Sequence, residues 1–142
     1  MFERLLQWLF PSDPTKAASS KSKVDSQLGE RGENVAAKFL TNAGYKILQR
    51  NYMTKVGEID IVARQGRTLV FVEVKTRTDD VVRPEDQVNA EKMHQITKAA
   101  SVYLSRFGHP QPPARFDVIA ILWPEGRDPI IRHHENAFEA TF

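Results

Sequence analysis

The sequence contains no cysteine, which excludes disulfides, thiolate nucleophiles, thiolate-ligated zinc and iron–sulfur clusters. It also lacks any apolar run near the roughly 20 residues that a membrane-spanning helix needs. The start, MFERLLQWLF, carries Glu3 and Arg4 and has no small-residue cleavage pattern behind it, which argues against a signal peptide. We therefore expect a cytoplasmic protein without a transmembrane segment.

A large excess of charge of either sign is missing as well. The 142 residues carry a formal net charge of +2, and 27% of them are charged while 41% are hydrophobic. These proportions are typical of a soluble globular protein, and the length suits one domain. A mildly basic chain permits a nucleic-acid partner without requiring one.

Large apolar residues are scarce between Pro11 and Gln27. This stretch is rich in serine, lysine and proline, so it cannot bury enough surface to fold by itself, and we interpret it as a linker. We divide the chain into an N-terminal arm and flexible linker, residues 1–28, and an α/β domain, residues 29–142. The apolar residues among the first ten have two interpretations. Either they pack on the domain or remain unpacked, or they contact a partner protein or a membrane surface.

Hydrophobic periodicity predicts the elements of the domain. Helical spacing from Gly29 to Ala43 predicts a first helix, and Gly44 suits its left-handed end. A long helix is predicted within residues 83–108, with an apolar stripe of Val88, Ile96, Ala99, Ala100, Tyr103 and Phe107. Strands are predicted at residues 45–52, 58–64, 68–76 and 115–122, with a short last strand within residues 128–138. This order predicts an α/β fold in which helices flank a mixed central β-sheet.

Charged residues interrupt two of these strands, at Glu58 and Asp60 and at Glu73 and Lys75. Two carboxylates on neighbouring strands can share one small cation, because Mg²⁺ takes oxygen ligands and completes its shell with waters or phosphate oxygens. The backbone carbonyl of Val74 is a further candidate ligand. A lysine beside such an ion can orient or deprotonate an attacking water and hold a phosphate. Glu58 either adds a second metal position or hydrogen-bonds the backbone.

The pairing of these two strands follows from the turn between them. A turn centred on residues 65–66 places Ile59 and the other apolar residues of both strands on one face. On the other face it places Asp60 opposite Phe71. Asp60 and Glu73 then become diagonal neighbours with α-carbons roughly 7–8 Å apart. We expect both carboxylates to reach one shared site.

Glu33 joins this set from the first helix. It lies at helical spacing with Ala36, Ala37 and Leu40, on or beside the face that packs on the sheet. A charged residue there is costly unless it is paired or bound to a metal. We therefore expect Glu33 to point at the site from the helix.

The ordered set of a helix glutamate, a strand aspartate and Glu-x-Lys in the next strand resembles the PD-(D/E)-x-K nuclease superfamily, in particular its archaeal Holliday-junction-resolvase-like branch. The segments GERGENVAAKFL, NYMTKVGEIDIVAR, LVFVEVKTR, RFDVIAI and HHENAF are similar to the YraN-like family of uncharacterised bacterial proteins. The likeness covers roughly residues 29–138. A bare Glu-x-Lys is a weak signal and the ordered set a strong one, although Ile59 stands in place of the proline that names the superfamily.

This resemblance implies a restriction-endonuclease-like or resolvase-like core and a Mg²⁺- or Mn²⁺-dependent endonuclease acting on branched or structured DNA. Glu33, Asp60 and Glu73 become metal-site residues, Val74 a carbonyl ligand and Lys75 the catalytic lysine. One alternative is a non-catalytic nucleic-acid-binding module on the nuclease fold, and another is a structural adaptor. Many resolvase-like enzymes pair to cut two strands, so the resemblance also allows a homodimer.

Basic and polar residues around the set are candidate contacts for nucleic acid. The candidates are Arg77, Lys92, Gln87 and Arg64, with Lys55, Arg67, Arg83 and Lys98 as further basic residues. They either line a phosphate track or form an ordinary charged surface. The segment Arg77 to Gln87 has turn chemistry and few apolar anchors, which makes it a candidate flap over the substrate.

Two further features of the last strands have mainly structural interpretations. Asp117 lies inside an apolar strand, where an unpaired carboxylate is costly, so we expect Arg115 or Lys75 to be its partner, with a secondary role near the site as the alternative. His133 and His134 are adjacent, so their side chains point to opposite faces of a strand and do not easily chelate one ion. We expect both histidines at an edge or on the surface.

Overall fold

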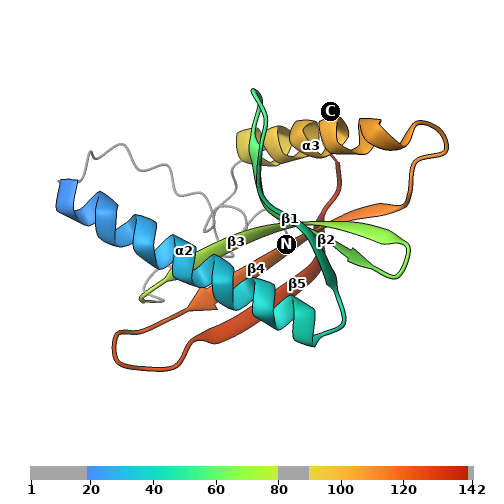
Figure 1. The fold of residues 1–142 in the computed structure, drawn as a ribbon. Coiled ribbons are helices and arrows are strands. Elements are labelled where there is room, and N and C mark those ends of the chain that lie inside the picture. The colour runs from blue at the N-terminus through green and yellow to red at the C-terminus, as the bar shows by residue number, and fades with distance from the viewer. Residues whose placement is uncertain (1–18, 80–89, 141–142) are drawn as a thin grey trace.

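The computed structural model describes residues 19–79 and 90–140. Its elements are α2 (Ser19–Asn42), β1 (Lys46–Met53), β2 (Glu58–Gln65), β3 (Thr68–Arg77), α3 (Ala90–Leu104), the 3-10 helix η2 (Ser105–Phe107), β4 (Ala114–Leu122) and β5 (Ile130–Phe138). The five strands form one sheet in the order β1-β2-β3-β4-β5, with β3 and β4 parallel and the other neighbours antiparallel. α2 lies across one face of the sheet and α3 covers the other (Figure 1). The predicted α/β fold with a mixed central sheet is confirmed, and it is compatible with a restriction-endonuclease-like core.

α2 begins at Ser19, so the prediction that the first helix begins at Gly29 is wrong. Residues 19–28, which the composition assigns to a flexible linker, form the first part of a helix of 24 residues. A stretch that cannot fold alone can still extend a helix whose later turns are anchored on the sheet, here by the fully buried Ala36 and Leu40. Residues 1–18 of the predicted arm lie outside the described residues. Among the helices that the structure describes, none is long and apolar enough to cross a membrane.

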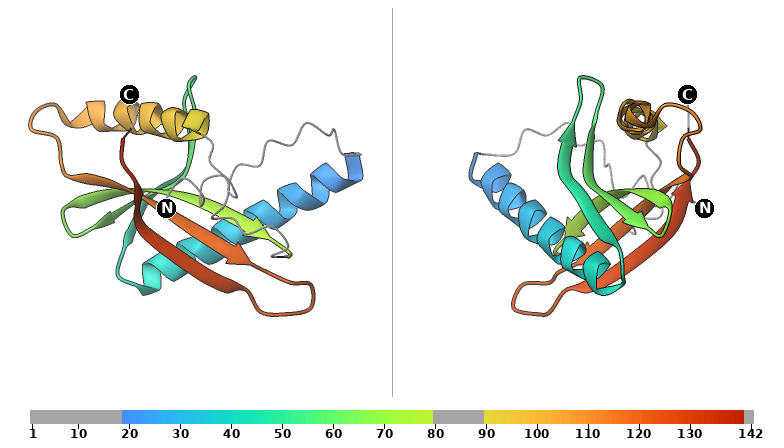
Figure 2. Two further views of the ribbon diagram at one scale, coloured as in Figure 1. Left: turned by 180° about the vertical axis from the view of Figure 1, so that it is seen from behind. Right: turned by 45° about the vertical axis from the view of Figure 1, so that its right-hand side comes forward.

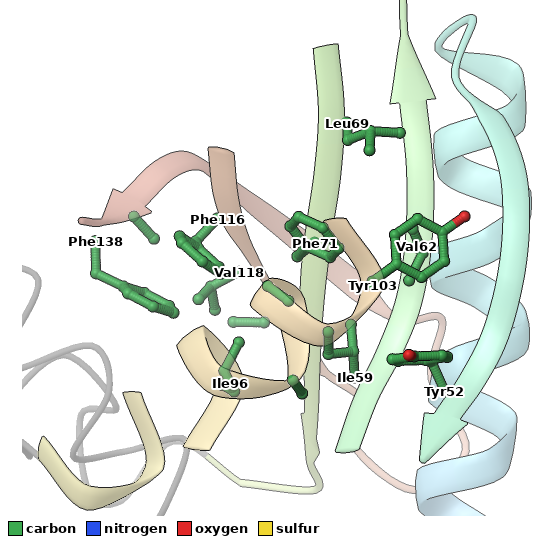
Figure 3. Packing of buried hydrophobic residues seen from close by; sticks show 14 residues of the cluster. Tyr52, Ile59, Val62, Leu69, Phe71, Ile96, Tyr103, Phe116, Val118 and Phe138 are labelled. Carbon is green, nitrogen blue, oxygen red and sulfur yellow. The ribbon is translucent and has the colours of Figure 1, made fainter. Parts of the chain in front are cut away.

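Two apolar clusters, one on each face of the sheet, form the core. The α3 cluster consists of Tyr52, Ile59, Val62, Leu69, Phe71, Ile96, Ala99, Ala100, Tyr103, Phe116, Val118, Ala120, Ala137 and Phe138 (Figure 3). The α2 cluster consists of Ala36, Leu40, Tyr45, Ile61, Ala63, Val70, Val72, Ile119 and Ile121. Because helices cover both faces, successive residues of β3 and β4 are buried alternately toward one helix and then the other.

The second predicted helix is confirmed over most of its apolar stripe. Ile96, Ala99, Ala100 and Tyr103 are buried against the sheet. Phe107 is 47% exposed, so its place in the stripe was predicted wrongly. α3 ends at Leu104 and continues as η2, whose tighter winding turns Phe107 away from the stripe. Val88 lies outside the described residues.

The predicted register of the β2–β3 hairpin is wrong. Phe71 pairs with Val62 and not with Asp60. The turn is centred on residues 66–67, one residue later than predicted, and Gly66 occupies the left-handed region with φ 59°. Both registers keep each residue on the same face of its strand, so the alternation of apolar residues could not choose between them.

β2 also bends, so the prediction that Ile59 and Ile61 share one face is wrong. Ile59 belongs to the α3 cluster and Ile61 to the α2 cluster. The change of face occurs opposite Asn51 of β1, which has a positive φ of 52°. Beyond this point the β1–β2 hairpin curls toward α3 (Figure 2). At its tip a Cβ on Gly57 would lie 2.7 Å from the carbonyl oxygen of Gln95 on α3.

The crossing of α2 over β3 depends on Gly32. A methyl group at this position would overlap the side chain of Thr76 on β3. We expect Gly32→Ala to lower the free energy of unfolding by about 1–3 kcal/mol, because the helix must move away from the sheet. Urea denaturation measures this change. Thr76→Ala in the same chain should restore part of the loss, because it removes the hydroxyl oxygen but leaves the Cβ of residue 76 at 2.9 Å from the added methyl group.

Gly29→Ala is the matched control for this prediction. Gly29 lies in the same helix, and a methyl group added there meets no atom within 4 Å. Its stability should stay level or rise by up to about 1 kcal/mol, since alanine favours helix over glycine. A Gly32→Ala variant as stable as Gly29→Ala would contradict the close crossing of α2 and β3.

Candidate functional site

The two strands that carry the predicted site separate at Asp60. The last bridge between β2 and β3 is Ile61 with Val72. Beyond it the amide of Val74 has no ladder partner on β2, and it donates instead to Oδ2 of Asp60 at 2.8 Å. Asp60 is therefore fixed beside the middle residue of the Glu-x-Lys tripeptide. We call the region between Asp60 and residues 73–75 the fork.

Glu73 and Lys75 form the β3 side of the fork. Val72 and Val74 lie in or against the α2 cluster, so the alternation of β3 directs Glu73 and Lys75 toward the opposite face, that of α3. Both side chains are partly buried. The tripeptide thus presents its carboxylate and its ammonium group on one face of the sheet, next to the strand end that carries Asp60.

Glu33 approaches the fork from α2. Its side chain is 19% exposed, and Oε2 lies 3.9 Å from Nη2 of Arg50 on β1. The pKa of Glu33 is raised to about 7, first by burial and then by the negative charges of Asp60 and Glu58, against the opposing effects of Arg50 and a hydrogen bond from Asn51. Three carboxylates, from α2 and β2, therefore lie within electrostatic reach of one another.

The residues that were predicted to contact nucleic acid lie at different distances from the fork. Arg77 follows Lys75 by two positions, on the same face at the end of β3. Arg64 lies at the far end of β2, beside the hairpin turn, so the structure does not bring it to the carboxylates. Lys92 falls in the first turn of α3, but its side chain lies outside the described residues, as do Gln87 and residues 80–87 of the predicted flap.

The donor groups at the fork suit a small, hard cation. Carboxylate oxygens from Asp60, Glu73 and Glu33 are the ligands that Mg²⁺ and Mn²⁺ prefer. The pKa of Glu33 is raised first by burial and then by the negative charge of Asp60. Within residues 19–79 and 90–140, no three metal-ligating side chains converge to enclose an ion by themselves. The set fits Mg²⁺, which is usually held by one or two carboxylates and completed by waters and substrate oxygens, better than a metal that requires a closed protein cage.

Sequence reasoning missed Arg50 and Asn51 as neighbours of Glu33. Arg50 is the only cation among the charges that shift the pKa of Glu33 in the described part of the chain. The sequence did carry a signal for Arg50, because a charged residue inside the predicted strand 45–52 needs a partner of opposite charge. The positive φ of Asn51 had only a weak signal, because asparagine visits the left-handed region more readily than most residues but most asparagines do not adopt it.

Asp117 is fully buried in a separate network on the α2 side of β4. Arg115 donates to it from Nε at 2.9 Å and from Nη2 at 3.1 Å. The amide of Asn136 donates at 3.0 Å, and Nε2 of His133 lies 2.8 Å away. Burial alone would raise the pKa of Asp117, but these bonds hold it below its ordinary value. The predicted partner Arg115 is confirmed, and Lys75, on the opposite face, is not a partner.

His133 lies on β5, an edge strand of the sheet, as predicted, but the alternative that it lies on the surface is wrong. Its side chain is 11% exposed, and its ring packs edge-on against Phe39 and Tyr45. The hydrogen bond to Asp117 explains the burial, because it satisfies a ring nitrogen that would otherwise be costly to bury. Its neighbour His134 pairs with Val118 and so faces the other side of the sheet, as expected.

Comparison with known proteins gives consistent matches across the domain. The family model described as "Uncharacterised protein family UPF0102" matches residues 32–121. A UPF0102 protein of Geotalea daltonii is 48% identical over 116 residues, which cover 81% of this chain and 91% of that one. UPF0102 proteins of Pelobacter propionicus and Geobacter sulfurreducens are 47% and 46% identical, cover 89% and 91% of this chain, and are matched over 94% and 99% of their own lengths. The fork and Glu33 lie inside the matched region.

Proposed function

This chain belongs to the family described as uncharacterised protein family UPF0102, and we propose that it is a metal-dependent endonuclease of nucleic acid. We expect its preferred substrate to be DNA with a branched or otherwise structured shape. We also expect it to act in the cytoplasm. The observation that carries this proposal is the hydrogen bond from Val74 to Asp60, which holds the strand aspartate against the Glu-x-Lys tripeptide. The homodimer stays a prediction. The contact of residues 1–10 with a partner protein or a membrane surface stays a prediction as well.

The fork divides the chemistry between its residues. Asp60, Glu73 and the carbonyl of Val74 would hold Mg²⁺ or Mn²⁺, with Glu33 adding negative charge from α2. The bound ion would stabilise charge that develops on the phosphoryl group and activate water at neutral pH. Lys75 lies on the same face as Glu73, where its ammonium group holds a phosphate oxygen or orients the attacking water. The water gives up a proton as its oxygen adds to phosphorus, and the opposite phosphorus–oxygen bond breaks, with the leaving oxygen taking up a proton from solvent.

The charge of the fork favours hydrolysis over simple binding. Glu33, Asp60 and Glu58 crowd negative charge around a single guanidinium group. Carboxylates repel phosphates unless a cation lies between them, and a module that only binds nucleic acid would be better served by lysines or arginines. The non-catalytic nucleic-acid-binding module is therefore the second candidate.

Cleavage by the purified wild-type chain tests this proposal. The substrates are labelled single-stranded, duplex, flapped and four-way DNA, with RNA of matching sequence, in Mg²⁺, Mn²⁺ and EDTA. We expect cutting in Mg²⁺ or Mn²⁺, none in EDTA, and the fastest cutting on branched DNA. Cleavage of circular single strands separates endonuclease from exonuclease action. Tight binding without cleavage of any substrate would reject the enzyme in favour of the binding module.

A further inference from the structure

A cavity of about 350 Å³ lies between the first half of α2 and the turn after β4. Gln27, Arg31, Thr78, Trp123 and Glu125 supply its polar and aromatic lining. The volume falls in the range of pockets that hold small organic groups. None of the fork residues lines it, so it is a separate site.

Trp123 gives this cavity a rigid aromatic wall. Its ring packs against the α2 cluster, and Nε1 donates to the carbonyl oxygen of Arg127 at 3.0 Å. Its backbone amide donates to the carbonyl oxygen of Arg77 at 2.7 Å. The guanidinium carbon of Arg31 lies 4.3 Å from the centre of the ring. An indole that is anchored at its edge and carries an exposed arginine side chain over its ring is a surface on which a planar group can stack.

The cavity and the fork share one edge of the sheet. Thr78 follows directly after β3 and lies four residues beyond Val74, a distance of at most roughly 13 Å, and Trp123 follows directly after Leu122, which pairs with Arg77. α2 passes close to this edge (Figure 1). Glu73 and Lys75 face the α3 side of the sheet and the cavity lies on the α2 side, so a strand of nucleic acid that joins the two must pass around the ends of β3 and β4, which takes a few nucleotides.

α2 connects the two places. Gly32 contacts β3 at Thr76, and its neighbours on the helix point to different sides. Arg31 reaches Trp123 on the β4 side, while Glu33 reaches Arg50 on the β1 side. The close crossing at Gly32 thus sets the position of the cavity relative to the carboxylates.

We propose that this cavity receives one unpaired base of the nucleic acid, which displaces the guanidinium group of Arg31 from its place over Trp123 and stacks on the ring, while Arg31 then covers the other face of the base or holds a neighbouring phosphate. Stacking on an aromatic ring and an arginine plane is the common way in which proteins hold unpaired bases. Gln27, Thr78 and Glu125 line the cavity with groups that can hydrogen-bond a base edge. The inference rests on the proposed function in that it takes nucleic acid as the substrate, and it explains a preference for branched or irregular shapes, because a continuous duplex has no free base to offer.

Binding to two matched duplexes in EDTA tests the pocket without requiring hydrolysis. One duplex carries 2-aminopurine as a single-base bulge, and the other carries the same base paired. We expect the full-length wild-type chain to bind the bulged duplex roughly tenfold more tightly and to quench 2-aminopurine fluorescence in it. The affinity ratio is the affinity for the bulged duplex divided by that for the paired duplex. Trp123→Leu should bring this ratio close to one. Arg31→Gln should lower it in part, and Trp123→Phe should keep most of it.

Phe107→Leu is the matched control, because Phe107 is an exposed aromatic residue outside both sites, and its affinity ratio should equal that of the wild type. Circular dichroism melts ensure that the variants are folded. A wild-type ratio near one, or a ratio that Trp123→Leu leaves unchanged, would overturn the pocket. Parallel assays in Mn²⁺ keep the two proposals apart. Discrimination of the bulge without cleavage would overturn the nuclease and uphold the pocket, whereas cleavage without discrimination would do the reverse.

Discussion

Lys75→Met is expected to lower the single-turnover rate of metal-dependent cleavage by about 10²–10⁴-fold. Methionine keeps the apolar stem of the lysine and removes only the ammonium group, so the sheet should fold unchanged. The loss should be in the rate of cleavage, because Lys75 acts on the phosphate or the attacking water beside Glu73. Substrate affinity should change far less, since other basic residues supply most contacts with phosphates.

Lys75→Arg separates the two roles of this lysine. If the side chain only holds a phosphate oxygen, arginine should recover much of the activity. If it also takes up a proton from the attacking water, arginine should fail, because its guanidinium group stays protonated. Lys38→Met, at an exposed position of α2 outside the candidate contacts for nucleic acid, is the matched control and should cut at the wild-type rate. A Lys75→Met enzyme within threefold of the wild type would exclude a catalytic lysine at this position.

Asp117→Ala is expected to lower the free energy of unfolding by about 3–5 kcal/mol. Asp117 is fully buried and receives hydrogen bonds from Arg115 and from the amide of Asn136. Its removal leaves the guanidinium of Arg115 without its closest anion and opens the contact with His133. Asp128→Ala, at an exposed position, should change stability by less than about 0.5 kcal/mol. Urea denaturation at pH 7 measures both variants.

The stability that Asp117 supplies should depend on pH in a defined direction. Its pKa in the folded chain lies below its ordinary value, so the contribution is complete above the unfolded pKa of about 3.9. It disappears as the pH falls through the lower, folded pKa. The difference in stability between the wild type and Asp117→Ala should therefore be constant at neutral pH and shrink below about pH 4. A difference that grew on acidification would contradict the paired, ionised state of Asp117.

The elements and the fold could be predicted from the sequence because local patterns determine them. Gly44, helical spacing and buried apolar strands marked the order of helices and strands, and the charged residues at Glu73 and Lys75 stood out against that pattern. The position of Glu33 on a packing face had a physical signal as well, since a charge there requires a partner. The structure places Glu33 near Asp60 and Glu58.

Features that depend on two distant segments could not be predicted in the same way. The register of β2 and β3 was predicted wrongly because alternation is satisfied equally by a shift of two positions, and the bend at Asn51 moves Ile59 to the other face. The burial of His133 depends on a carboxylate one strand away, across an irregularity in the β4–β5 pairing. The contact of Arg31 with Trp123 joins segments that no sequence pattern connects.

The decisive measurement is the cleavage of four-way and circular DNA in Mn²⁺ by the wild type and by Asp60→Asn, purified in parallel. Asparagine can still accept the hydrogen bond from Val74 through its carbonyl oxygen, so this variant should fold while losing the negative charge that would hold the cation. We expect the wild type to cut both substrates, EDTA to stop it, and Asp60→Asn to be inactive with its melting temperature unchanged. Equal cleavage by both proteins, or by neither, would contradict a metal-dependent nuclease at the fork.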